Sequence, residues 1–159
     1  MTEQASRALP SRARIVVVGG GVGGTSVAYH LALSGERDVV LVDRSELTSG
    51  STFHSAGLVG QLRSDPTLTA MNRYSVDLYS SLQQGDTPPG WVQCGSIRLA
   101  STQERWEEIQ RQAGWAASSG LEMSLISADE AQALFPLMST DGVVGACFLP
   151  TDGQVDPSS

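Results

Sequence analysis

The sequence has few of the features that mark membrane, metal or nucleic-acid proteins. No apolar run approaches the roughly 18 residues that a membrane-spanning helix needs. The net charge of −7 gives no support for binding nucleic acid or an anionic membrane, because both call for basic patches. The two histidines, His30 and His54, show no metal-ligand spacing, so no metal is predicted. With 40% hydrophobic residues, the composition is that of a globular domain.

Cysteine is equally scarce. Cys94 and Cys147 are far apart and form no CxxC pair, so we expect reduced, partly buried thiols in a cytoplasmic protein. Residues 1–13 are polar and include Arg7 and Arg12. A mitochondrial presequence would share these arginines, but the stretch is short and has no clear amphipathic helix. A disordered tail is therefore predicted over residues 1–13.

A strand, a glycine-rich loop, a helix and a second strand follow the tail. The apolar run from Ile15 to Val18 is typical of a strand buried on both faces of a parallel sheet. The next six residues fit G-x-G-x-x-G: Gly19, Gly20, Gly21, Val22, Gly23 and Gly24. In this pattern Gly19 permits the tight turn, Gly21 leaves room for a pyrophosphate, and Gly24 lets the helix lie close to the strand.

The helix after the loop is predicted to bury one apolar stripe and to end at Gly35. The stripe consists of Gly24, Val27, Ala28, Leu31 and Ala32. The amino end of this helix would direct N–H groups at phosphates. A second buried strand, Val39 to Val42, ends at Asp43, where an acid accepts hydrogen bonds from an adenosine ribose. A carboxylate there would repel the 2′-phosphate of NADP, although Arg44 beside it weakens this argument slightly.

The middle of the chain is predicted as a loop followed by a long helix. Residues 47–60 are rich in small side chains, and Asp65 and Pro66 then indicate a helix start that runs to about Gln84. Its expected buried face is Leu68, Met71, Ser75, Leu78, Tyr79 and Leu82. A domain crossing is predicted near Pro88 and Pro89.

The last third alternates strands and helices. Residues 96–100 are predicted as a half-buried strand with Ile97 and Leu99 on its inner side. Residues 101–104 and 127–130 each fit a capping box that opens a helix. The first of these helices would bury Trp106, Ile109, Ala113 and Ala116 and end at Gly120. Short strands are expected within 121–126 and 143–149.

The predicted parallel sheet is incomplete, because such a sheet needs more than two strands. No further strand–helix–strand unit follows Asp43. We therefore expect the remaining strands beyond residue 159, in a longer protein of which this chain is the N-terminal piece.

The quoted residues resemble a known family. Residues 19–24, Asp43 and the string 47–58 resemble the FAD-dependent amine dehydrogenases of the D-amino-acid-oxidase superfamily, and within it the sarcosine and dimethylglycine dehydrogenase group. The string Ser-Thr-aromatic-His-x-Ala-Gly-Leu at 51–58 is quite specific. Supporting matches lie at 60–63, 95–100, 135–138, 150–153 and 156–157.

The resemblance implies an α/β fold. It consists of a Rossmann-like FAD-binding domain, whose N-terminal part spans residues 14–88, and the beginning of an α+β substrate domain over 89–159. It also implies that His54 is covalently bonded to the 8α-methyl carbon of the flavin, and neutral imidazole is a competent nucleophile near neutral pH. Position alone favours an ordinary loop histidine. The implied cofactor-binding residues are Gly19, Gly21, Val22, Gly23, Gly24, Asp43, Arg44, Gly50, Ser51, Thr52, Phe53, His54, Ser55, Ala56, Gly57 and Leu58.

The implied activity is oxidation of a secondary or tertiary amine such as sarcosine or dimethylglycine. Hydride would pass to the flavin, and hydrolysis of the iminium would release formaldehyde. The resemblance also implies electron-transferring flavoprotein or oxygen as acceptor, a tetrahydrofolate-binding C-terminal region, and the mitochondrial matrix as location in a eukaryote. Catalytic residues are expected beyond residue 159. The alternatives are an inactive remnant or regulatory homologue that keeps the FAD-binding fold, and a nicotinamide-binding reductase, which the His54 loop disfavours.

Overall fold

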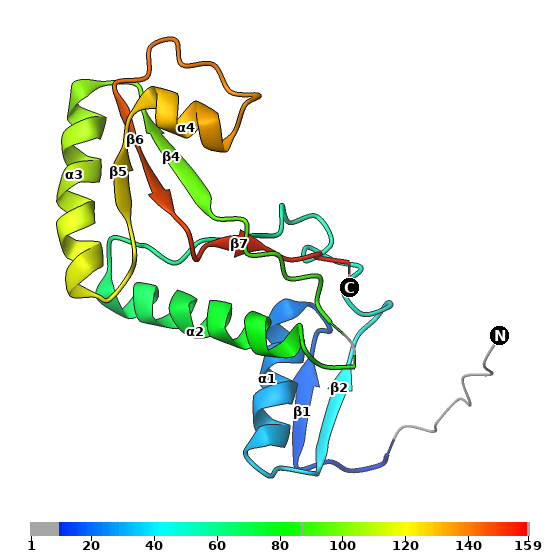
Figure 1. Ribbon diagram of the computed structural model, residues 1–159. Coiled ribbons are helices and arrows are strands. Elements are labelled where there is room, and N and C mark those ends of the chain that lie inside the picture. Colours follow the sequence, from blue (N-terminus) through cyan, green and yellow to red (C-terminus); the bar gives the residue numbers. More distant parts are fainter. Residues whose placement is uncertain (1–9, 87, 159) are drawn as a thin grey trace. The chain divides into compact units, whose positions relative to one another are not determined.

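The computed structural model describes residues 10–86 and 88–158, which form two compact units (Figure 1). The first unit ends at Ser55, and the second runs from Ala56 to Pro157. Most of the predicted tail lies outside the described residues. The predicted domain crossing near Pro88 concerns the complete protein and stays a prediction.

The first unit is the predicted βαβ arrangement. Strand β1, Ile15–Val18, and strand β2, Val39–Val42, pair in parallel, with Ile15 opposite Val39. Helix α1, Val22–Leu33, connects them. The predicted capping glycine, Gly35, follows the end of the helix and has a φ of 88°. The N–H groups of Gly35 and of the next residue cap the last helical carbonyls, which is the Schellman arrangement.

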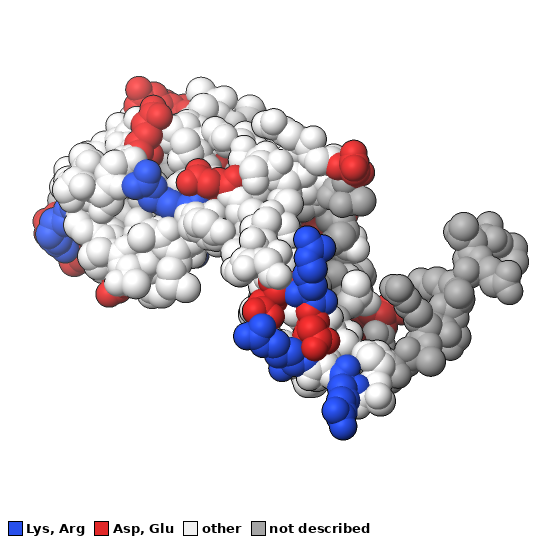
Figure 2. All heavy atoms as spheres, turned by 90° about the horizontal axis from the view of Figure 1, so that it is seen from below, with Lys and Arg blue, Asp and Glu red and all other residues white. Residues whose placement is uncertain are grey.

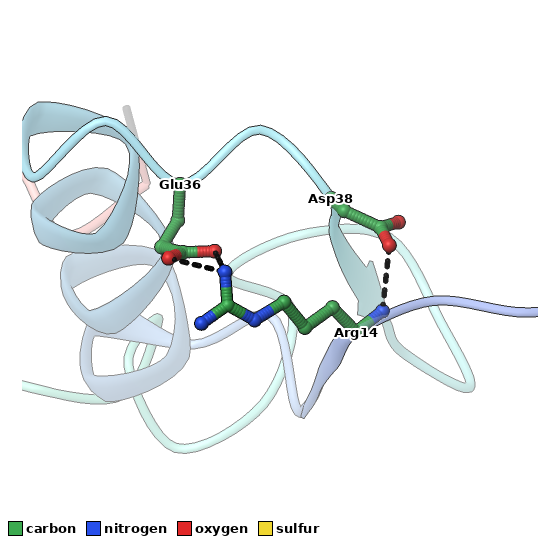
Figure 3. A network of polar contacts seen from close by, with 3 residues as sticks. All are labelled: Arg14, Glu36 and Asp38. Atoms are coloured by element: carbon green, nitrogen blue, oxygen red, sulfur yellow. Dashed lines mark hydrogen bonds and ion pairs between the residues drawn. The ribbon is translucent and has the colours of Figure 1, made fainter.

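Arg14 makes hydrogen bonds to the segment between α1 and β2 (Figure 3). Its guanidinium donates to both carboxylate oxygens of Glu36 at 2.9 and 3.0 Å. Its backbone N–H donates to Asp38 at 3.0 Å. These contacts join the residue before β1 to the connection between α1 and β2, at the end opposite the glycine-rich loop.

The predicted burial of this unit is wrong for the described residues. Val16 and Val18 are 55% and 82% exposed, and Val27 of α1 is 51% exposed. No residue of α1 is buried. The reason is that β1 pairs with one strand, β2, and the helix covers one face of that pair, so edges and the other face stay uncovered in the described chain.

The second unit is antiparallel. Its helices are α2, α3 and α4, over Pro66–Leu82, Gln103–Ser118 and Ala128–Leu134. Strands β4, Ser96–Ala100, β6, Gly145–Leu149, and β5, Ser124–Ile126, form one sheet in that order (Figure 1). Strands β3, Leu58–Val59, and β7, Gly153–Gln154, form a second pair. The mixture of helices with antiparallel strands confirms the expected α+β character.

The helix starts follow the sequence with one exception. The Asp65 carboxylate accepts from the N–H of Leu68 at 3.0 Å, as predicted, and Ser127 forms the predicted capping box with Glu130. The box predicted at 101–104 is wrong. Thr102 is the N-cap of α3 and accepts from the N–H of Arg105, so no acid occupies the position that a box requires.

The core lies in the second unit. It consists of Leu62, Ala100, Ile109, Ala116, Leu121, Cys147 and Leu149, with Trp106, Trp115 and Met123 packed against it. Burial of Ile109 and Ala116 confirms the predicted inner face of α3, whereas Ala113 and Trp106 are half-buried. Burial raises the pKa of the Cys147 thiol, while Cys94 is exposed.

Two predicted faces are wrong in part. In β4, Ala100 is fully buried and Leu99 is 39% exposed, because Ala100 pairs with Gly145, against which Trp106 packs. In α2, Thr69 and Val76 are buried, whereas the predicted Leu68 and Met71 are exposed. The other predicted residues of that face are half-buried: Ser75, Leu78, Tyr79 and Leu82.

Two further structural findings concern function. Among the described residues, no helix is both long enough and apolar enough to cross a membrane. In the same part of the chain, no three His, Cys, Asp or Glu side chains gather as metal ligands do.

Candidate functional site

The glycine-rich loop has the geometry that its sequence predicts. Gly19 has a φ of 109°, and its N–H donates to the carbonyl of Val42 at 2.8 Å, which binds the loop to β2. A Cβ at Gly24 would lie 1.8 Å from the Gly19 carbonyl oxygen. Helix α1 can therefore cross the end of β1 this closely only because residue 24 is glycine.

The amino end of α1 presents backbone donors. The N–H of Thr25 makes the first helical hydrogen bond, to the Gly21 carbonyl at 3.0 Å. The N–H groups of Gly23 and Gly24 precede that bond and have no helical acceptor. A Cβ added at Gly23 would meet no atom within 4 Å, so this end of the helix is open to a ligand. Such an end binds anions through its donors and its dipole.

The Asp43 carboxylate lies next to the glycine-rich loop. One carboxylate oxygen accepts from the N–H of Gly20 at 2.6 Å, and the other from the N–H of Ser45 at 2.8 Å. The bond from Gly20, followed by that from Ser45, lowers the pKa of Asp43. Each oxygen keeps a further lone pair that can accept from a ribose hydroxyl.

The loop that carries His54 is bound to the glycine-rich loop. The N–H of Thr48 donates to the Gly20 carbonyl at 3.0 Å, and the N–H of Val22 donates to Thr52 Oγ1 at 2.9 Å. Within the His54 loop, the N–H of Phe53 donates to the Thr48 carbonyl at 3.1 Å. Thr48 adopts a φ of 63°, which is rare for a β-branched residue.

These bonds add residues that the sequence analysis did not assign to the site. Gly20, Ser45 and Thr48 act there through backbone groups. A backbone donor has no signature in the residue type, so composition and spacing could not indicate them. The structure also gives Gly21 a second reason to be glycine, since a Cβ there would lie 2.9 Å from Thr52 Oγ1.

His54 is exposed at the end of this loop. Its ring meets the edge of Phe53, with centroids 5.6 Å apart and planes at 79°. Arg44, Gly50, Ser51 and Ser55 are also exposed in the first unit.

The last three predicted site residues belong to the second unit. Gly57 has a φ of 66°, and its carbonyl accepts from the N–H of Val155 at 2.9 Å. Ala56 is exposed, and Leu58 pairs with Gln154 while its side chain is 77% exposed. The predicted site residues from Gly19 to Ser55 thus lie in the first unit, and those from Ala56 to Leu58 in the second.

Side-chain charge around the first unit is balanced. Acidic and basic side chains lie close together on the face in Figure 2 rather than forming a patch of one sign. Its described cations are Arg12, Arg14, Arg37 and Arg44, and its described acids are Glu36, Asp38, Asp43 and Glu46. A bound pyrophosphate would therefore meet mainly backbone N–H donors.

The residues present fit an adenine dinucleotide. The open amino end of α1 suits a pyrophosphate, and the Asp43 carboxylate suits a ribose. Phosphate donors and the ribose acceptor come from one βαβ unit. The chemistry of a bound flavin would come from the cofactor, and the chain would hold it and supply the His54 imidazole.

Comparisons with known proteins agree with this geometry. Residues 14–159 match the family model described as FAD dependent oxidoreductase. The chain is 39% identical over 150 residues to 4-methylaminobutanoate oxidase (formaldehyde-forming) of Paenarthrobacter nicotinovorans, covering 94% of this chain and 18% of that protein. It is 41% identical over 149 residues to mitochondrial dimethylglycine dehydrogenase of Rattus norvegicus, covering 93% of this chain and 17% of that protein.

A regulatory protein is nearly as similar. The chain is 38% identical over 154 residues to the mitochondrial pyruvate dehydrogenase phosphatase regulatory subunit of Mus musculus, covering 96% of this chain and 18% of that protein. The chain thus spans less than a fifth of the length of these relatives.

A solved structure shares the fold. The crystal structure of L-proline dehydrogenase from P. horikoshii superposes with a TM-score of 0.88 at 30% identity, covering 94% of this chain and 40% of that one. This agreement confirms the predicted fold class. The glycine-rich loop, the Asp43 acceptor and the match over residues 14–159 together show that the chain belongs to the FAD dependent oxidoreductase family.

Proposed function

We propose that the protein oxidises the C–N bond of a secondary or tertiary N-methyl amine, such as dimethylglycine or sarcosine, with FAD as the electron acceptor. One observation carries this proposal. The chain combines the FAD family fold with 39–41% identity to two proteins whose names specify N-methylated amines as substrates. Bound FAD would supply the two-electron oxidant, and water would then release formaldehyde from the oxidised methyl group.

The part of this chain in that reaction is to hold the cofactor. The N–H groups at the start of α1 would hold the pyrophosphate, and Asp43 would hold the adenosine ribose. By the resemblance, Arg44 and residues 50–58 would supply the other cofactor contacts, Thr52 through its backbone, because its hydroxyl already accepts from the N–H of Val22. We assign no substrate base or carboxylate clamp to the described residues and expect these groups elsewhere in the full-length protein.

We further propose that His54 is bonded covalently to the flavin. The new bond would join an imidazole nitrogen to the 8α carbon, each losing one hydrogen. The two electrons and two protons would pass to dioxygen, which leaves as hydrogen peroxide. Exposure of His54 in a loop bound to the glycine-rich loop supports this role, because the imidazole is accessible beside the proposed cofactor site.

Other features of the enzyme follow from the resemblance. The re-oxidant would be an electron-transferring flavoprotein or oxygen, and a folate-binding region of the full-length protein would accept the one-carbon unit. The location would be the cytoplasm, or the mitochondrial matrix in a eukaryote.

The test uses the full-length protein. Anaerobic addition of dimethylglycine, sarcosine or 4-methylaminobutanoate should bleach the flavin absorbance and release formaldehyde. Glycine and 4-aminobutanoate, which have no N-methyl group, are the matched controls. For the covalent bond, acid-denatured wild-type protein should keep flavin fluorescence on the polypeptide band, and His54→Ala should lose it while still binding FAD reversibly. A colourless protein that ignores added FAD would refute the proposal.

A second candidate is a regulatory protein that keeps the FAD-binding fold. The 38% identity to a phosphatase regulatory subunit favours it. Such a protein would bind FAD and leave every amine unreacted, so the same titration separates the two candidates.

A further inference from the structure

We propose that Thr52 is a positioning residue for covalent attachment of the flavin. Its hydroxyl fastens the loop that carries His54 to the first residue of the phosphate-binding helix. This inference rests on the proposed bond between His54 and the flavin, and it concerns how the chain places the imidazole rather than whether the bond exists.

The contact lies within the first unit. The N–H of Val22, the first residue of α1, donates to Thr52 Oγ1 at 2.9 Å. Its direction is fixed, because the backbone N–H can only donate and the hydroxyl oxygen accepts. Gly21 packs against the same oxygen, since a Cβ there would lie 2.9 Å from it. The hydroxyl is therefore held between the helix end and its own loop.

The Thr52 contact lies close to His54 in the loop. A second hydrogen bond between the two loops runs from the Thr48 N–H to the Gly20 carbonyl, six residues before His54 in the sequence. Thr52 comes directly before the Phe53–His54 pair, and the N–H of Ser55 donates to the Thr52 carbonyl at 3.0 Å. Thr52 thus makes two contacts that flank His54. Its side chain accepts from α1, and its carbonyl accepts from Ser55, the residue after the histidine.

The consequence is specific to a bond-forming step. Covalent attachment requires the imidazole nitrogen to be held at the target carbon, and orientation of this kind contributes to rate. Reversible binding of FAD depends instead on the other donors of α1 and on Asp43. Removing the Thr52 hydroxyl should therefore slow attachment more than it weakens reversible binding.

The experiment measures both quantities in the full-length protein. Apoprotein is mixed with FAD, and flavin fluorescence on the denatured polypeptide is followed with time. We expect Thr52→Val to slow attachment by about fivefold, which corresponds to one ordinary hydrogen bond, and Thr52→Ser to restore it. The reversible dissociation constant, measured with His54→Ala and with the Thr52→Val/His54→Ala double variant, should agree within about twofold.

Thr25→Val is the matched control. Its hydroxyl belongs to the same helix end but donates to the Gly21 carbonyl at 3.1 Å and not to the His54 loop. We expect this variant to attach flavin at the wild-type rate. Hydrogen exchange of the Val22 amide gives a second readout. Without FAD, this amide should be protected in His54→Ala and unprotected in the Thr52→Val/His54→Ala double variant.

Several results would overturn the inference. The first is attachment at the wild-type rate in Thr52→Val, and the second is attachment in Thr52→Ser that is as slow as in Thr52→Val. The third is a loss of reversible FAD affinity in the double variant as large as the loss of attachment rate in Thr52→Val, which would make the Thr52 hydroxyl a cofactor ligand. An unprotected Val22 amide would also refute it. A wild-type protein that never attaches flavin would refute the His54 bond instead, and the exchange measurement would still test the Thr52 contact.

Discussion

At the scale of single residues, the closest backbone approach in the site depends on Gly24. Because a Cβ there would lie 1.8 Å from the Gly19 carbonyl oxygen, Gly24→Ala forces α1 away from β1. We expect the free energy of unfolding of the first unit to fall by about 3 kcal/mol, the upper range for overpacking. Urea unfolding followed by circular dichroism would measure this.

The control for this prediction is Gly114→Ala. Gly114 is a glycine within α3, and a Cβ there would meet no atom within 4 Å. The substitution should raise the free energy of unfolding by about 0.5–1 kcal/mol, because alanine loses less conformational freedom than glycine in a helix. If both alanines had the same effect, the close approach at Gly24 would not constrain this site.

Asp43 should make the first unit sensitive to acid. Its pKa is lowered from 3.8 by the N–H groups of Gly20 and Ser45, so the unfolded chain takes up this proton at a higher pH than the native chain. The stabilisation is full above pH 3.8 and is lost as the pH falls through the lower native value. Denaturant unfolding across this range should show a steeper loss for wild type than for Asp43→Asn, and parallel curves would contradict the prediction.

The residues that sequence analysis identified are those whose role depends on their type. Glycine at 24 is required by the close approach of α1 to β1, and an acid at 43 is expected where a ribose would bind, so spacing alone indicates both. The contact of Thr52 with Val22 depends on how residues 44–51 fold back, and nothing in their types encodes that path. Likewise, the positive φ of Thr48 opposes the preference of threonine and could not be predicted.

At the scale of elements, a buried carboxylate joins three segments of the second unit. Asp152 is 1% exposed. Its Oδ1 accepts from the N–H of Gln61 at 2.9 Å, and its Oδ2 accepts from the hydroxyl of Ser96 at 2.6 Å. It thus connects the turn before β7 to the segment after β3 and to the start of β4.

Replacing this carboxylate should be costly. Asp152→Ala leaves the Gln61 N–H and the Ser96 hydroxyl without their acceptor, and we expect a loss of about 3 kcal/mol in the free energy of unfolding. Asp152→Asn keeps one acceptor oxygen and should cost less. The exposed Asp141 is the control, and Asp141→Ala should stay within about 0.5 kcal/mol of wild type in the same urea titration. Equal stabilities of the two alanine variants would refute this role of Asp152.

The buried face of α2 differs from the prediction for a related reason. Sequence patterns weigh apolar residues, so Leu68 and Met71 were expected inside. The structure instead buries Thr69, whose hydroxyl accepts from the N–H of Arg63 at 3.0 Å. A polar side chain can be buried when such a partner exists, and that partner lies in a separate loop that periodicity does not include.

At the scale of the whole molecule, burial is unevenly divided between the two units. All buried hydrophobic side chains among the described residues lie at Leu62 or later. The first unit has its predicted strands and helix, yet Val18 is 82% exposed. Order of elements could be predicted because it is encoded locally, whereas coverage of the strands depends on segments that pair with them.

This division predicts where the chain is protected from hydrogen exchange. In the isolated 159-residue polypeptide, amides of β1 and β2 should exchange much faster than those of β6, because stable protection requires buried apolar contacts around the hydrogen bonds. In the full-length protein with FAD bound, β1 and β2 should become as slow as β6, since ligand binding adds to the stability of the unit that holds it. Amides of β6 are the internal control in both samples. Equal protection of β1 and β6 in the isolated polypeptide would show that the βαβ unit is stable without further coverage.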